Sequence, residues 1–314
     1  MIVSKKEDLI YMKRISNNVH NVFLYGLCGF FLLFFLACTS NSNPKHSQET
    51  DNDISGIIQL HKNMNEKHGK TDGYYANLAV ADGDYDKSYQ LHYQECKLGS
   101  VIGCLNAYYI GEERSLRAYD SDSFAIEFDN SIHKSIHACK KNESLGCVNL
   151  FFAFDVLNDD DEFVKNIATE ALDGHNNDMI VDKALNMTKK ECEQDDATSC
   201  FFHARMLRIM DSYADVEYYI DKGLDLSYVL APFVRLPMQS PQTIDYFKRS
   251  CALNEALSCR YVAYWFDKYE DDTLKGKQFY KKACNLGLNS ACEEATKPVR
   301  VQTDELGSPV INRR

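Results

Sequence analysis

The chain has 314 residues, of which 45% are hydrophobic and 12% aromatic, so it can bury a sizeable core and is not an intrinsically disordered protein. Its formal net charge is −11, from 46 acidic and 35 basic side chains. Because a phosphate-binding surface needs clustered Lys and Arg, we expect neither a nucleic acid nor an anionic membrane surface as the main ligand.

Residues 1–37 have the features of an export signal. A basic stretch, MKRISNN at residues 12–18, precedes an apolar run of 16 residues from Val22 to Ala37. This order is typical of a signal peptide, whereas a membrane-spanning helix needs on the order of 20 apolar residues. Residues 1–37 are therefore predicted to be a signal peptide, and Met12 is an alternative start to Met1.

The end of this run, FFLAC, resembles the lipobox of bacterial lipoproteins. The resemblance implies that Cys38 is the lipidated first residue of the mature chain and that the membrane is contacted through this lipid only. Thr39 in place of Asp implies retention in the outer membrane, facing the periplasm. Phe35 and Leu36 depart from the pattern, which prefers Leu and a small residue there. An uncleaved anchor and ordinary secretion therefore remain alternatives.

Ten further cysteines form five pairs with one spacing, in which seven residues stand between the two cysteines. The pairs are Cys96 and Cys104, Cys139 and Cys147, Cys192 and Cys200, Cys251 and Cys259, and Cys284 and Cys292. Of the twelve cysteines, only Cys28 in the signal and Cys38 lie outside the pairs. Export to an oxidising compartment favours five disulfides. Zinc ligation is the alternative, although zinc sites usually place about two residues between neighbouring cysteines.

Each pair is flanked by helix-like runs, such as YDKSYQLHYQEC before and CLNAYYI after the spacing of the first pair. If the first cysteine ends one helix and the second begins the next, the disulfide clips an antiparallel hairpin at its turn. Gly99, Gly146 and Gly287 fall in these turns, where a left-handed conformation favours glycine. Closing a nine-residue loop contributes about 2.6 kcal/mol in the chain-entropy model.

The segments FYKKACNLGLNSAC and DYFKRSCALNEALSC resemble Sel-one-like repeats, which are relatives of the tetratricopeptide repeat, in the cysteine-rich branch found in secreted bacterial proteins. The resemblance covers residues 73–296. It implies a right-handed superhelix of helix pairs. It also implies that aromatic residues before the first cysteine pack between helices, and these are Tyr246, Phe247, Phe279 and Tyr280.

The repeats are irregular. Successive first cysteines are 43, 53, 59 and 33 residues apart, whereas a regular array steps by about 36. Residues 163–174 and 216–233 are interpreted as helical units without a disulfide. The predicted fold is an all-α solenoid of disulfide-clipped helical hairpins over residues 55–296. A flexible tether over 38–54 precedes it, and a disordered tail over 297–314 follows it.

Few residues suggest catalysis or metal binding. One Ser-x-x-Lys motif joins Ser131 and Lys134, without the accompanying Ser-Asp-Asn or Lys-Thr-Gly, and it is predicted to lie on the solvent face of a helix. His133 and His137 lie one turn apart without a third ligand. The acidic runs at 82–86 and 158–163 suit helix N-termini rather than calcium loops. We therefore predict no catalytic residue, metal or cofactor.

The sequence thus predicts a binding scaffold whose groove takes another protein or a peptide. Relatives of this repeat class that neutralise toxic effectors in the periplasm suggest a sharper hypothesis, that of an immunity protein. The alternative is a penicillin-binding or β-lactamase-like cell-wall enzyme, an activity assigned to some cysteine-rich relatives.

Overall fold

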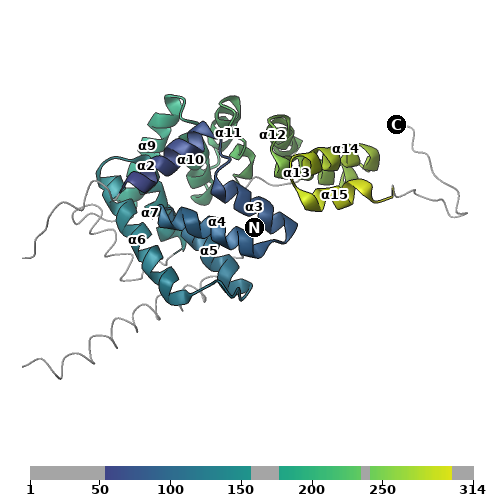
Figure 1. The fold of residues 1–314 in the computed structure, drawn as a ribbon. Helices are drawn as coiled ribbons and strands as arrows, with labels where there is room; N and C mark the ends of the chain where they lie inside the picture. Colours follow the sequence, from purple (N-terminus) through teal and green to yellow (C-terminus); the bar gives the residue numbers. More distant parts are fainter. Residues whose placement is uncertain (1–53, 157–176, 235–240, 299–314) are drawn as a thin grey trace, which may run out of the picture. The chain divides into compact units, whose positions relative to one another are not determined.

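The computed structural model describes residues 54–156, 177–234 and 241–298 (Figure 1). In these ranges every regular element is a helix, which confirms the predicted all-α class. The α-helices are α2 (Ser55–Glu66), α3 (Asp72–Asp82), α4 (Tyr85–Lys97), α5 (Val101–Glu113), α6 (Ser121–Lys140), α7 (Ser144–Val156), α9 (Asn177–Glu193), α10 (Ala197–Ile209), α11 (Val216–Asp225), α12 (Pro241–Ala252), α13 (Ala256–Lys268), α14 (Thr273–Asn285) and α15 (Asn289–Thr296), with a 3₁₀ turn η1 (Ala231–Phe233). The predicted signal, most of the tether and tail, and the segments 158–163 and 163–174 lie outside the described residues.

The chain divides into two compact units. Unit 1 comprises the residues up to 62 together with 89–190, and unit 2 comprises residues 63–88 and 191–314. In unit 1, α6 packs against α5 and α7; in unit 2, α10 to α15 pack on one another in chain order and α15 also contacts α3. This stacking of successive helices within each unit is the arrangement of a solenoid.

All five predicted cysteine pairs lie at disulfide distance. The S–S lengths are 2.00–2.09 Å and the Cα–Cα distances 4.5–4.7 Å. In each pair the first cysteine lies in the last turn of one helix and the second in the first turn of the next. The disulfides therefore clip five helical hairpins at their turns, as the spacing predicts.

The turns share one left-handed residue, three positions after the first cysteine. These residues are Gly99 (φ 102°), Asn142 (φ 63°), Asp195 (φ 68°), Asn254 (φ 63°) and Gly287 (φ 95°). The prediction for Gly99 and Gly287 is confirmed, but the prediction for Gly146 is wrong. Gly146 lies inside α7, where a Cβ atom would meet the Cβ of Ala138 at 2.6 Å. It is needed for the close approach of α6 and α7, and Asn142 takes the left-handed position, which Asn tolerates.

The second helix of most hairpins carries its own N-cap. Ser100 accepts a hydrogen bond from the Gly103 N–H (2.9 Å), and Asp196 accepts one from the Ser199 N–H (2.7 Å). Glu255, a fully buried carboxylate, accepts from the backbone N–H groups at the start of α13. These side chains satisfy donors that a helix start leaves without partners.

The last hairpin obtains its cap from another part of the chain. The residue before α15 is the buried, apolar Leu288. Asp82 of α3 instead accepts hydrogen bonds from the N–H groups of Asn289 (3.1 Å) and Ser290 (2.7 Å). A carboxylate more than two hundred residues away in sequence therefore completes α15.

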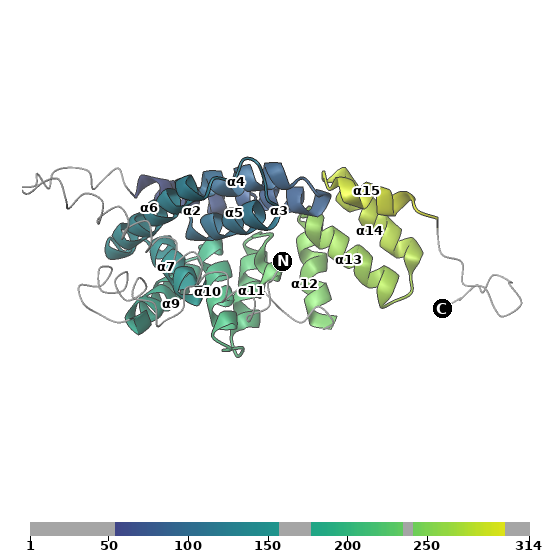
Figure 2. The same ribbon diagram turned by 90° about the horizontal axis from the view of Figure 1, so that it is seen from below.

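The segment 63–84 of unit 2 contacts all three disulfide turns of that unit. Asn65 accepts a hydrogen bond from the Thr198 N–H (3.0 Å), and Lys70 donates one to the Asn254 carbonyl (3.1 Å). The ring of Tyr74 packs into the core formed by α12 to α15, and its hydroxyl lies 3.4 Å from the Ala256 N atom. Figures 1 and 2 show α3 beside α13 and α15.

Lysines also join successive hairpins within each unit. Lys134 donates to the Lys97 carbonyl (2.9 Å), Lys183 to the Cys139 carbonyl (2.7 Å) and Lys282 to the Cys251 carbonyl (2.7 Å). Each lysine belongs to the next described helix after the hairpin it contacts. Because the last carbonyls of a helix have no partner within it, these bonds stabilise both the helix end and the stacking.

The aromatic residues named by the repeat resemblance are located as expected. Tyr246, Phe247 and Tyr280 are buried, and Phe279 is partly buried with its ring stacked on Phe266 at 5.5 Å between centroids. The unit predicted at 216–233 is also confirmed as helical, because it forms α11 and η1 without a disulfide.

Candidate functional site

Helix α11 in unit 2 has an apolar face and an acidic face. Tyr219, Ile220 and Leu224 are buried on one side. Glu217, Asp221 and Asp225 follow one another at intervals of one helical turn, so they form a single ridge on the surface. We call Glu217, Asp221 and Asp225 the acidic ridge.

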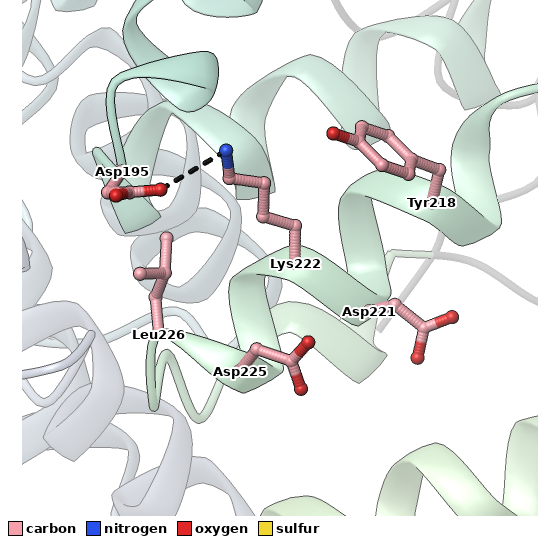
Figure 3. A pocket seen from close by; sticks show the side chains of 6 residues that line it. All are labelled: Asp195, Tyr218, Asp221, Lys222, Asp225 and Leu226. Atoms are coloured by element: carbon pink, nitrogen blue, oxygen red, sulfur yellow. Dashed lines mark ion pairs between the residues drawn. The ribbon is translucent and has the colours of Figure 1, made fainter.

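An open cavity of about 450 Å³ lies on this side of unit 2 (Figure 3). It is lined by Asp195, Tyr218, Asp221, Lys222, Asp225 and Leu226. All but Asp195 belong to α11 or to the residue that follows it. Asp195 comes from the disulfide turn between α9 and α10, where its backbone is left-handed and its side chain is largely exposed. The fold thus brings a turn and a helix of different hairpins to one hollow.

Side chains of helix α12 contact the acidic ridge. Arg249 forms ion pairs with Asp225, at 2.8 Å, and with Asp221. Gln242 donates a hydrogen bond to Glu217 (2.7 Å), and the Tyr246 hydroxyl lies 3.4 Å from an Asp221 oxygen. Since these pairs are largely exposed, each contributes little to stability. They show instead that the ridge accepts a guanidinium and an amide.

The groups around the cavity carry a small negative charge. Asp195, Asp221 and Asp225 line it; Lys222 pairs with Asp195 at 3.2 Å (Figure 3), and Arg249 of α12 pairs with Asp221 and Asp225. Burial raises the pKa of the neighbouring Tyr246, and the charge of Asp221 acts in the same direction. Only the effect of Asp221 reports the negative charge of the acidic ridge, because burial raises the pKa of a phenol whatever the sign of the local potential.

Tyr218 gives the cavity an aromatic wall. Its side chain is 55% exposed, and its ring meets that of Tyr219 edge-on at 5.0 Å between centroids. A tyrosine face beside carboxylates can hold an ammonium or guanidinium group by cation–π and ionic attraction.

The serine motif has a different environment from the one predicted. Ser131 is fully buried, not on the solvent face, and its hydroxyl donates to the Phe128 carbonyl (2.7 Å). It also lies 3.2 Å from the sulfur of Cys104. The helix face that contains it packs into unit 1 together with Ile132 and Ser135. Lys134 is directed to the Lys97 carbonyl, so the motif presents no accessible nucleophile with a lysine base.

The predicted histidine pair does not gather a ligand set. His133 is exposed, and its Nε2 lies 3.7 Å from a carboxylate oxygen of Asp129. Within the described ranges, no group of three His, Cys, Asp or Glu side chains is arranged to hold a metal ion. Cys38 lies outside these ranges.

Of the predicted acidic runs, the one at 82–86 does serve helix starts, through Asp82 and through Asp84, which accepts a hydrogen bond from the Lys87 N–H at 3.1 Å.

Sequence reasoning did not identify the α11 cavity. Its signal was present, because acidic residues at 217, 221 and 225 share one face of any helix. The sequence does not indicate that Asp195 and Arg249, which come from neighbouring hairpins, lie beside α11.

Among the described helices, none has the length and apolar character needed to cross a bilayer.

No family model matches the sequence, and no curated protein matches it. A solved structure of a Sel1 repeat protein from Oxalobacter formigenes is similar to this chain, with a TM-score of 0.29 and 12% identity, over 82% of this chain and 96% of that one. That protein has the repeat type which the cysteine motifs resemble.

Proposed function

We propose that this protein is an extracytoplasmic helical-repeat scaffold that binds a protein partner through the α11 cavity and the acidic ridge. The observation that carries the proposal is the half-exposed ring of Tyr218 beside an open cavity lined by three carboxylates. Tyrosine is enriched where proteins bind one another, because it supplies a large rigid surface with a polar end. The expected partner presents a basic side chain to this cavity.

Five disulfides support a location outside the cytoplasm, since reducing systems in the cytosol keep thiols free. The finer form of the proposal is an envelope lipoprotein, anchored through a lipid on Cys38 and facing the periplasm. Its partner would be a toxic effector delivered into that compartment, which the protein neutralises as an immunity protein. The lipobox-like FFLAC and the repeat resemblance support this form.

The binding proposal is tested by isolating and identifying the partner from periplasm, then measuring its affinity with purified proteins. We expect Tyr218→Ala and Asp225→Asn to weaken binding, because each removes a group from the cavity. Tyr75→Ala is the matched control, since Tyr75 is a similarly exposed tyrosine on α3. Unchanged affinity of Tyr218→Ala, or the absence of any partner that binds the purified protein, contradicts the proposal.

The anchor is tested by growth with labelled palmitate. The wild-type chain is expected to incorporate the label, and Cys38→Ser is expected to lose it. A wild-type chain that is exported without label contradicts the lipoprotein form and leaves the binding proposal standing. If the identified partner is toxic, deletion of this protein should sensitise cells to it, and Tyr218→Ala should fail to protect them.

A further inference from the structure

A second exposed surface lies at the other end of unit 2, where α13 turns into α14. Tyr264, Tyr269 and Leu274 are 43%, 49% and 66% exposed. The Trp265 ring lies 4.8 Å from that of Tyr269, and the two tyrosine rings are 6.2 Å apart. We call Tyr264, Trp265, Tyr269 and Glu270 the aromatic turn. Trp265 itself is partly buried against the core of unit 2, so the exposed part of this surface is formed by the two tyrosines and Leu274. Exposed tyrosines that lie together are typical of a protein-binding surface.

The aromatic turn is acidic. The Trp265 indole N–H lies 3.3 Å from a Glu270 carboxylate oxygen, which places this charge at the edge of the ring cluster. Residues 267–272 contain four acidic side chains and one lysine, and that lysine pairs with Asp267 at 3.5 Å. Rings that offer their faces beside carboxylates are complementary to a cation.

The turn that follows the preceding disulfide-clipped hairpin holds an arginine against a tyrosine ring. At the turn from α10 to α11, the Arg208 guanidinium lies over the Tyr213 ring at 4.2 Å, and the Tyr213 hydroxyl donates to Asp211 at 2.9 Å. Arg208 stands eight residues after Cys200. The residue eight positions after Cys259 is Asp267, so the aromatic turn has rings and carboxylates but an acid in place of that arginine.

A neighbouring contact shows that cations bind rings in this hairpin too. Lys275 lies over the Phe266 ring at 4.1 Å. Phe266 is buried, however, whereas Tyr264 and Tyr269 face solvent. The exposed rings are therefore placed to receive a basic group from outside the chain.

We propose that the aromatic turn binds an arginine-bearing segment of a partner protein, with the guanidinium on the Tyr269 and Trp265 rings and paired with Glu270. This rests on the proposed protein-binding function, but it concerns a surface separate from the α11 cavity. An arginine fits better than a lysine because its planar group stacks on aromatic rings and pairs with a carboxylate at the same time.

Trp265 allows a direct test, because it is the single tryptophan of the chain. The full chain is titrated at low salt with a synthetic peptide of alternating Gly and Arg, which has no fluorescence of its own. We expect a saturable change in Trp265 emission that weakens at high salt. Peptides with Glu or Gln in place of Arg serve as matched probes and should produce no such change.

Variants assign the effect to the aromatic turn. Tyr269→Ala and Glu270→Gln should each weaken binding of the Arg peptide by about two- to five-fold, and Tyr269→Phe should retain it. Tyr213→Ala, which removes a similarly exposed tyrosine from another turn, should leave the titration unchanged. Thermal unfolding of each variant verifies that it is folded.

The inference is overturned if Trp265 emission does not respond to the Arg peptide, if the Glu peptide gives the same change, or if a folded Tyr269→Ala variant binds as the wild type does. These results are independent of the test of the α11 cavity. If no partner bound the purified protein, the proposed function would be wrong, whereas the result of the peptide titration would still stand. Failure of the titration would leave the α11 cavity in place.

Discussion

The two ends of the hairpins in unit 2 differ in chemistry. At the disulfide end, the turns of the 192–200, 251–259 and 284–292 pairs are clipped, capped and contacted by the segment 63–84. At the open end, where one hairpin continues into the next, the turns present exposed aromatic residues such as Tyr213 and Tyr269. Stabilising interactions gather at the disulfide end and exposed rings at the open end, while the α11 cavity includes Asp195 from a disulfide turn.

The largest effect is expected from removing a disulfide at the disulfide end. Cys251→Ser together with Cys259→Ser opens a nine-residue loop and should lower the free energy of unfolding by about 2.6 kcal/mol. Urea unfolding of the oxidised proteins measures this difference. A loss below about 0.5 kcal/mol, the range of ordinary surface substitutions, would contradict a stabilising role for the clip.

A smaller effect is expected from the cap that joins α3 to α15. Asp82→Ala leaves two N–H groups of α15 without their acceptor and should cost about 1 kcal/mol. Asp245→Ala is the control, because the Asp245 carboxylate forms an exposed pair with Lys248 at 3.0 Å, and such a pair contributes little to stability. Equal unfolding midpoints for Asp82→Ala and the wild type would show that the cap is not formed in solution.

Glu255 should make the free energy of unfolding depend on pH. Burial raises the pKa of this carboxyl above its ordinary value of 4.5, so the folded chain holds the proton more tightly than the unfolded chain does. Its contribution to stability is then present below pH 4.5 and is lost as the pH rises through the raised value. Urea unfolding over this range should show a steeper decline for the wild type than for Glu255→Gln. Parallel profiles would contradict the effect of burial.

The smallest effect on stability is expected at the open end. Tyr218→Ala and Tyr269→Ala remove exposed rings and should change the free energy of unfolding by no more than about 0.5 kcal/mol. Denaturation of both variants measures this change beside their binding. A large loss of stability would mean that these rings belong to the packed core, and the contrast between the two ends would fail.

The hairpins were predictable from sequence because a disulfide imposes a local geometric constraint. Cysteines eight positions apart can be joined only if the chain reverses between them, and the flanking periodicity predicts helices on both sides. The left-handed turn residue was predictable too, as Gly, Asn or Asp occupies the third position after every first cysteine. Gly146 was misinterpreted because a glycine required by helix contact looks the same in sequence as one required by φ.

Features that depend on distant segments were not predictable. The burial of Ser131 is not such a feature, because Ser131 lies three residues after Phe128 and eight before Cys139, on the apolar face of its own helix. Asp82 caps a helix more than two hundred residues away, since Leu288 leaves that cap vacant in its own hairpin. The α11 cavity likewise depends on Asp195, which a turn of another hairpin supplies.

The central claim is that neighbouring cysteines join each hairpin at its turn. Mass spectrometric mapping of the unreduced protein, purified from the cell envelope, tests it most directly. The account predicts five links, each between cysteines eight positions apart, with no free thiol among those ten. Free thiols, bound zinc or links between different pairs would contradict it.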